Sequence, residues 1–316
     1  MLELVIRRIC ETHADLLLAV HFDQVRFLAR HLKELSNYTQ LCSVPRPETL
    51  DLVHDKWTLH QFLCDHGLPS PVTKLIRNTP EFWQEAAGQQ FPAAVKLLSG
   101  SSGMDMMVYE SFEQMAGSKE QIERLAERAV LQSYIIGYDI DFNMLCKEGE
   151  ILAYTIQKSA MTRRNPFGAD RAIEFFDDEE TLDTVRRLVK LLRWNGVANL
   201  DIRVSRQAGE RMVVDFNPRY WASMCGSLIA GVNFPVIACY EALGLPLPPH
   251  QQKLTKYIWP VETIYQLPRQ LFVSRGPRFS FAESGLQYVF KDPKVYSSLF
   301  LNRLRSWKFL KSTLLR

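Results

Sequence analysis

Residues 196–219 read G-V-A-N-L-D-I-R-V-S-R-Q-A-G-E-R-M-V-V-D-F-N-P-R. Two runs in which apolar and polar residues alternate lie on either side of a short polar turn, which is the pattern of a β-hairpin. Gly209 in this turn can take a positive φ, as a tight connection requires. On the second run, Val214 and Phe216 are predicted to face the core and Val213 the polar side. The resulting register predicts two pairs of facing polar residues: Asp201 with Asp215, and Asn199 with Asn217.

Facing carboxylates on neighbouring strands repel, because their Cβ atoms lie only about 5 Å apart. Asp201 and Asp215 beside the amide of Asn217 make chemical sense if a divalent cation lies between them. A few hard oxygen ligands suit Mg²⁺, which takes its other ligands from water and substrate phosphates. Arg219 would add a planar guanidinium beside the metal, where a phosphate or carboxylate would lie. A solvent-exposed hairpin with acidic residues on its wet face would show the same pattern, so both interpretations stay open at this point.

The composition excludes several classes of protein. The chain has 316 residues, 47% of them hydrophobic, which is enough for a sizeable core. No run of about 18 apolar residues predicts a membrane span, and the first residues do not have the pattern of a secretory signal. The six cysteines form no C-x-x-C pair. A cytoplasmic protein with reduced thiols is therefore expected, without a disulfide framework or zinc site.

A strand, loop and strand between residues 91 and 109 form a second candidate element. Residues 91–97 are predicted to be a buried strand that contains Lys96, and burying an ammonium is costly without an anionic partner. The sequence S-G-S-S-G follows at residues 99–103, and its backbone N–H groups could wrap phosphate oxygens. It is not a Walker loop, because no G-K-[ST] follows. A plain hairpin connection is the commoner explanation of such a loop.

Residues 130–143 read V-L-Q-S-Y-I-I-G-Y-D-I-D-F-N. An apolar strand runs into Gly137, after which alternation resumes with Asp139 on the polar face. In structural terms the pattern is two sheet strands separated by a kink. In functional terms the linker backbone could hydrogen-bond a purine edge while Asp139 accepts ribose hydroxyl groups.

Taken in order, these pieces resemble the ATP-grasp superfamily, especially its carbamoyl-phosphate-synthase-like carboxylate–amine ligases. The resemblance covers about residues 45–244 and has seven motifs in register. They are D-K at 55–56, G-L-P-x-P at 67–71, P-A-A-V-K at 92–96, S-G-S-S-G at 99–103, Q-S-Y-I-I-G-Y-D at 132–139, D-F-N-P-R at 215–219 and A-G-V-N-F-P at 230–235.

The resemblance implies an α+β fold of the ATP-grasp type, in which two α+β subdomains grip ATP between them. Residues 1–45 would be an abbreviated N-terminal α/β segment, 46–130 the N-terminal subdomain, and 131–316 the C-terminal subdomain with a basic tail. The family normally begins with a complete nucleotide-like α/β domain. We therefore expect the short N-terminal region to be abbreviated, to lack its start, or to be completed by a homo-oligomer or another partner.

The resemblance also implies roles for individual residues. The predicted catalytic residues are Arg219, near the transferred phosphate and the substrate carboxylate, and Lys158, on the strand after the linker. The predicted metal ligands are Asp201, Asp215 and Asn217. The predicted nucleotide-binding residues are Lys56, Lys96, Ser101, Ser102, Gly103, Gln132, Ser133, Tyr134, Ile135 and Asp139.

Three positions depart from the family pattern. Asp215 stands where glutamate is usual, and its shorter side chain reaches less far toward a metal. Gln132 replaces a usual glutamate, and Leu97 replaces a proline.

Residues 162–169 are similar to a mobile loop that closes over the substrate in these enzymes.

The implied activity is that of a ligase dependent on ATP and Mg²⁺ (or Mn²⁺). ATP would phosphorylate a carboxylate, and an amine would displace the phosphate to form an amide or peptide bond. Two alternatives stay open: a carboxylase-like enzyme that uses bicarbonate, and an ATP-binding module without catalysis. The expected partners are a small-molecule carboxylate and an amine, with no nucleic acid.

The chain ends on a basic amphipathic segment. From Lys253 onward there are 12 Lys and Arg against 3 Asp and Glu. In residues 301–316 apolar side chains fall at helical spacings, so a helix docked on the C-terminal subdomain is predicted. Contact with an anionic membrane is the less favoured alternative.

Overall fold

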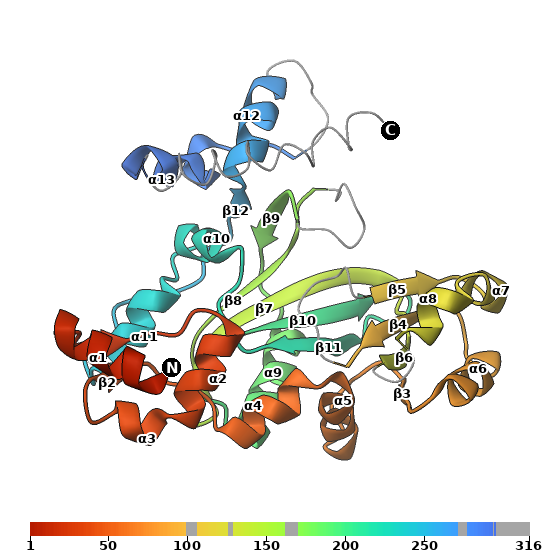
Figure 1. Ribbon diagram of the computed structural model, residues 1–316. Helices are drawn as coiled ribbons and strands as arrows, with labels where there is room; N and C mark the ends of the chain where they lie inside the picture. The colour runs from red at the N-terminus through yellow and green to blue at the C-terminus, as the bar shows by residue number, and fades with distance from the viewer. Residues whose placement is uncertain (99–105, 126–128, 162–169, 271–276, 293, 295–316) are drawn as a thin grey trace.

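The computed structural model describes residues 1–98, 106–125, 129–161, 170–270, 277–292 and 294 (Figure 1). Three sequence-based predictions fall outside this part of the chain. They concern the phosphate loop with Ser101, Ser102 and Gly103, the loop 162–169, and the tail 301–316.

The N-terminal segment is mostly helical, and its two short strands pair in parallel. Helix α2 begins at Phe22, and α3 follows it almost directly. Asp55 caps α5, because its carboxylate accepts from the backbone N–H groups of Trp57 and Thr58 at 2.9 and 3.0 Å. The elements are α1 (Leu2–Thr12), β1 (Leu16–Leu17), α2 (Phe22–Arg30), α3 (Leu32–Leu35), β2 (Gln40–Leu41), α4 (Pro47–His54) and α5 (Lys56–Asp65).

A smaller antiparallel sheet follows, with its described strands in the order β3-β6-β4-β5. Helices α6, α7 and α8 cover one face, where Phe82, Met115 and Ile122 pack against strand residues such as Val95. Because side chains alternate along a strand, Lys96 lies on the other face. The elements are β3 (Thr73–Ile76), α6 (Thr79–Ala87), β4 (Ala93–Leu97), β5 (Met106–Tyr109), α7 (Phe112–Ala116), α8 (Lys119–Glu123) and β6 (Ala129–Ser133).

The larger sheet has the strand order β11-β10-β7-β8-β9-β12 within the described residues, and the long strands β7 and β8 lie at its centre (Figure 1). Neighbouring strands are antiparallel throughout. The elements are β7 (Gly137–Lys147), β8 (Glu150–Ser159), β9 (Ala172–Phe175), α9 (Glu179–Leu192), β10 (Gly196–Ser205), β11 (Arg211–Asn217), α10 (Met224–Ile229), α11 (Phe234–Ala242) and β12 (Lys256–Ile258).

The two faces of the larger sheet differ in chemistry. One face forms the main core, in which Phe142 and Leu200 pack with α9 and with the N-terminal helices. On the other face, Leu145 and Val197 pack against residues of α11 such as Phe234. Farther along the same strands, the side chains on this second face are polar. The second face therefore has an apolar half, covered by α11, and a polar half.

The hairpin of β10 and β11 has the predicted register, with Asp201 opposite Asp215 and Asn199 opposite Asn217. Gly209 has a φ of 72°. The prediction for the rest of β11 is wrong, because a bulge between Asp201 and Ile202 shifts the register by one residue. Val213 consequently lies in the core with 1% of its surface exposed, while Val214 is only partly buried.

The C-terminal part adds helices beyond β12 and contains α12 (Pro260–Arg269), η3 (Phe281–Glu283) and α13 (Leu286–Lys291), at the top of the view in Figure 1. No helix among the described residues is long and apolar enough to cross a membrane. The division into residues 1–45, 46–130 and 131–316 stays a proposal. Its second boundary falls within β6.

Candidate functional site

Polar side chains cross the second face of the larger sheet in two rows. Each row takes one residue from each of β8, β7, β10 and β11, because these residues lie opposite one another in the strand register. The first row is Gln157, Asp141, Asp201 and Asp215, and the second is Thr155, Asn143, Asn199 and Asn217.

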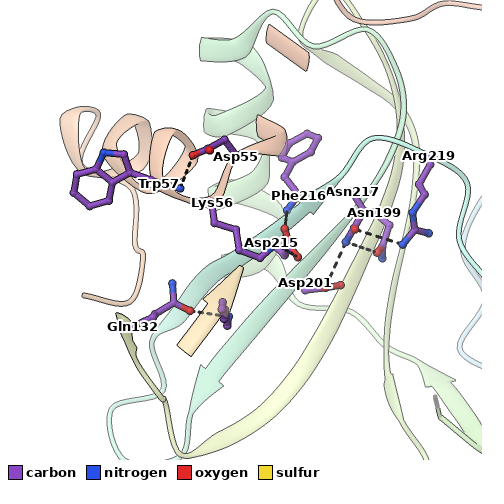
Figure 2. A network of polar contacts seen from close by, with 11 residues as sticks. Asp55, Lys56, Trp57, Gln132, Asn199, Asp201, Asp215, Phe216, Asn217 and Arg219 are labelled. Atoms are coloured by element: carbon purple, nitrogen blue, oxygen red, sulfur yellow. Dashed lines mark hydrogen bonds and ion pairs between the residues drawn. The ribbon is translucent and has the colours of Figure 1, made fainter. Parts of the chain in front are cut away.

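The carboxylates of Asp201 and Asp215 lie at the β11 end of the first row (Figure 2). Burial raises the pKa of the Asp201 carboxyl well above its usual range, and the neighbouring charges of Asp141 and Asp215 raise it further. The arrangement therefore disfavours several negative charges at once, and a divalent cation between the carboxylates would relieve this repulsion.

The oxygen donors at this point suit magnesium. Asp201 and Asp215 supply carboxylates, and the amide of Asn217 lies beside them, with Nδ2 3.4 Å from an Asp201 oxygen. The part of the chain that the structure describes contains no group of three or more His, Cys, Asp or Glu that could hold a metal. Two carboxylates and one amide oxygen leave coordination positions for water and phosphate oxygens, as Mg²⁺ usually requires.

Lys56 brings a positive charge to the metal residues from the N-terminal part of the chain. It is the first residue of α5, directly after the capping Asp55, and its Nζ lies 3.4 Å from Oδ2 of Asp215 (Figure 2). Its backbone N–H donates to the carbonyl of Leu98 at 3.0 Å. The start of α5 is therefore held beside the end of β4, and its first side chain reaches the acidic pair.

Lys96 extends from β4 and is buried, as its place in an apolar strand predicts. Its Nζ donates to Oε1 of Gln132 at 2.7 Å, and Nε2 of Gln132 donates to the hydroxyl of Thr73 at 2.8 Å. Burial lowers the pKa of Lys96 to about 8, although the charges of Asp215 and Asp201 act in the opposite direction. The ammonium is held by an uncharged amide here, and a phosphate would be a stronger partner.

Arg203 is a site residue that none of the sequence motifs indicates. Its guanidinium donates to Asp139 at 2.7 Å, to the carbonyl of Ile135 at 2.8 Å and to the hydroxyl of Tyr134 at 3.1 Å. It thus fixes the predicted adenine-binding linker and the predicted ribose-binding carboxylate together. The alternation of apolar and polar residues in the sequence indicates its position, because it places Arg203 on the polar face with Asp201. In the structure Arg203 lies opposite Asp139.

Gly137 lets the linker approach β10 closely. A Cβ atom at this position would lie 1.7 Å from the carbonyl oxygen of Val204. Only glycine fits that contact.

Ser133, at the end of β6, accepts a hydrogen bond from Nε2 of Gln89 at 3.2 Å.

Arg219 lies two residues after Asn217, the β11 member of the second row of polar side chains. Its Nη2 lies 3.5 Å from Oδ1 of Asn217, and its Nη1 donates to the carbonyl of Tyr220 at 3.2 Å. The guanidinium therefore stands beside the predicted metal ligands, as the sequence analysis expects (Figure 2).

Lys158 is not brought to the polar face. It lies opposite Ile140 of β7, on the side of β8 that faces the core, and its Nζ is 3.2 Å from Oε1 of Glu174. Gln157 faces the polar side instead and donates to Asp141 at 2.9 Å. Because side chains on a strand alternate, a difference of one residue moves a side chain to the opposite face.

Two sequence comparisons bear on the identity of the chain. A family model described as ATP-grasp in the biosynthetic pathway with Ter operon matches residues 126–264. A search of curated protein sequences found no match.

Solved structures share the fold at low sequence identity. The biotin carboxylase domain of Hydrogenobacter thermophilus 2-oxoglutarate carboxylase, solved with MgADP and bicarbonate, aligns with a TM-score of 0.65 at 16% identity, over 80% of this chain and 59% of that chain. N5-carboxyaminoimidazole ribonucleotide synthetase from Thermotoga maritima aligns at 0.56 and 18%, over 78% and 64%.

L-amino acid ligase from Bacillus licheniformis aligns with a TM-score of 0.56 at 16% identity, over 76% of this chain and 59% of that chain. At such identities the likeness establishes the fold alone. The aligned part of this chain spans about 59% of the length of the biotin carboxylase chains it resembles.

Proposed function

Since the chain is an ATP-grasp protein with the α+β fold that its motifs predict, we propose that it is an ATP- and Mg²⁺-dependent ligase. It joins a carboxylate to an amine through an acyl phosphate and releases ADP and phosphate. The observation that carries the proposal is the pair Asp201 and Asp215, which face each other within reach of Lys56.

The nucleotide would lie between the two sheets. Lys96 and Lys56 would contact its phosphates, because both ammonium groups lie near the acidic pair. Lys96 comes from the smaller sheet and Lys56 from α5. The backbone of Ser133, Tyr134 and Ile135 would take the adenine edge, and Arg203 would hold that backbone in position.

The chemistry follows from charge and position. A bound Mg²⁺ ion would neutralise phosphate oxygens and align them for transfer. The carboxylate oxygen attacks the γ-phosphorus as the bond to ADP breaks. The amine lone pair then attacks the acyl carbon, phosphate leaves, and the amine loses a proton. Arg219 would hold the substrate carboxylate and the transferred phosphoryl group through its planar guanidinium.

A carboxylase-like enzyme that uses bicarbonate as its acid is a second candidate. The specific support is the likeness to biotin carboxylase structures, one of which was solved with bicarbonate. The activated species would then be carboxyphosphate. An ATP-binding module without catalysis is the third possibility, and the shorter carboxylate of Asp215 is consistent with it. A cytoplasmic location and a homo-oligomer or partner protein are further parts of the proposal.

An ADP-release screen tests the proposal. The purified protein is incubated with ATP and Mg²⁺ together with pairs drawn from amino acids and small carboxylic acids, with bicarbonate as a separate acid. A ligase releases ADP only when both an acid and an amine are present. Release that needs bicarbonate identifies the carboxylase-like alternative. Nucleotide binding without ADP release under any condition identifies the module.

A further inference from the structure

The second row of polar side chains forms a continuous hydrogen-bonded chain through the sheet. Nδ2 of Asn217 donates to Oδ1 of Asn199 at 3.3 Å, and Nδ2 of Asn199 donates to Oδ1 of Asn143 at 3.0 Å. Nδ2 of Asn143 donates to the hydroxyl of Thr155 at 3.2 Å. We call these four residues the amide row.

The inner end of the amide row is anchored in the interior. The hydroxyls of Thr155 and Ser227 are 3.2 Å apart, and the indole N–H of Trp221 donates to Ser227 at 3.4 Å. The side chains of Asn143, Thr155 and Ser227 are fully buried. Such groups need their hydrogen bonds, because no water replaces a lost partner.

All three amides in the row point the same way. Each nitrogen donates toward the interior and each oxygen faces the β11 edge or accepts from the next amide. Reversing one amide alone would bring two N–H groups or two oxygens face to face at a junction. The amides can therefore reverse only together.

The direction of the row agrees with the contacts that Asn217 makes at the outer end. Its Nδ2 makes bonds to Asn199 and to Asp201, at 3.3 and 3.4 Å, so both amide hydrogens are used. The Oδ1 atom is left facing Arg219, whose Nη2 is 3.5 Å away. The side chain of Asn217 is therefore held on both sides, through its nitrogen by Asn199 and Asp201 and at its oxygen by Arg219.

We propose that Thr155 and Asn143 are positioning residues that hold the Asn217 side chain in place beside the carboxylates of Asp201 and Asp215. The proposal rests on the proposed function, in which Asn217 is a metal ligand. The Thr155 hydroxyl holds the inner end of the row, and Asn143 connects it to Asn199. Neither residue touches the substrate or the cation.

The test uses Thr155→Val, which keeps the shape of the side chain and removes the hydroxyl that bonds the buried amide of Asn143. Binding of Mn²⁺ in the presence of ADP is measured by the loss of the free-ion electron paramagnetic resonance signal. We expect Mn²⁺ to bind about tenfold or more weakly, as is found when groups that orient metal ligands are lost. Thr155→Ser retains the hydroxyl and should bind Mn²⁺ like the wild type.

Two further variants keep the result interpretable. Asn143→Leu interrupts the row at its centre and should weaken Mn²⁺ binding to a similar extent. Thr263→Val is the matched control, because Thr263 is equally buried and its hydroxyl bonds Ser284 outside the row. Thr263→Val should leave Mn²⁺ affinity unchanged, whatever it does to the melting temperature.

The outcomes separate this inference from the function on which it rests. If Asp215→Asn abolishes Mn²⁺ binding but folded Thr155→Val or Asn143→Leu binds like the wild type, the positioning role is wrong and the metal site stands. If the wild type binds no Mn²⁺ with ADP, both proposals are overturned.

Discussion

Lys96 carries a positive charge into a buried position, and the groups around it set the pH range in which it keeps that charge. Its pKa lies at about 8, lowered chiefly by burial. The charged groups that act on it are Lys56, Asp139, Asp201 and Asp215. Below pH 8 the ammonium can pair with phosphate, and above pH 8 the neutral amine cannot.

ATP affinity should therefore fall as the pH rises from 7 to 10. Gln132→Glu would place a carboxylate where the amide oxygen now lies 2.7 Å from Lys96. This change should raise the lysine pKa and move the loss of ATP affinity to higher pH. The measurement is the ATP dissociation constant as a function of pH for both proteins. Identical pH profiles would mean that Lys96 does not contact the nucleotide.

Asp215→Asn should abolish turnover while the fold survives. The neutral amide would hold Mg²⁺ less well, and its introduction would remove the repulsion with Asp201. We expect the rate of ADP release to fall more than about 100-fold, beyond the range seen when only outer groups are changed. The melting temperature should stay within a few degrees of the wild type. Unchanged ADP release in a folded variant would remove the hairpin metal site from the mechanism.

At the scale of elements, the linker between β6 and β7 depends on a side chain from β10. Arg203→Met would remove the charged hydrogen bonds to Asp139 and Ile135 while keeping much of the side-chain volume. We expect the KM for ATP to rise about tenfold, because one such bond contributes roughly 1.5–3 kcal/mol. The value of kcat should change less.

Arg206→Met is the matched control, since Arg206 is exposed and lies three residues farther along the same chain segment. This variant should keep the wild-type KM. If Arg203→Met also keeps it, the linker is fixed by its backbone contacts alone, such as the bond from Arg206 N–H to the carbonyl of Ile136.

The hairpin illustrates how far the sequence predicts an element. The alternation and Gly209 determine the pairing of Asp201 with Asp215, because the turn and the apolar face together specify the register. The bulge beside Asp201 could not be predicted, because one extra residue in an apolar run does not change the composition of that run. Val213 was misplaced for this reason. Lys158 presents the same difficulty, since resemblance alone did not determine which face of β8 it occupies.

At the scale of the whole molecule, residues far apart in sequence meet at one place. Lys56 comes from the start of α5, Lys96 from the smaller sheet and Asp215 from the edge of the larger one. The sequence motifs predicted these residues individually. Their approach could not be derived from local patterns, because it depends on the packing of two sheets. The amide row is likewise apparent only once four strands are in register.

The basic tail is predicted to dock on the C-terminal subdomain. Residues 301–316 lie outside the described part of the chain, so their docking stays a prediction from the spacing of apolar residues. The described surface offers a place for it, because α12 exposes Ile264 and Tyr265 and α13 exposes Phe290. Covering such side chains would remove apolar surface from water, at about 25 cal/mol per Å².

Deleting residues 301–316 should therefore lower the melting temperature by several degrees, since about 1 kcal/mol shifts the melting point of a large domain by about 2–4 °C. Replacing Arg303 and Arg305 with glutamine is the control, because it lowers the charge of the tail and keeps its apolar residues. This variant should melt like the wild type. A deletion that leaves melting unchanged but abolishes binding to vesicles containing anionic lipid would show that the tail contacts a membrane instead.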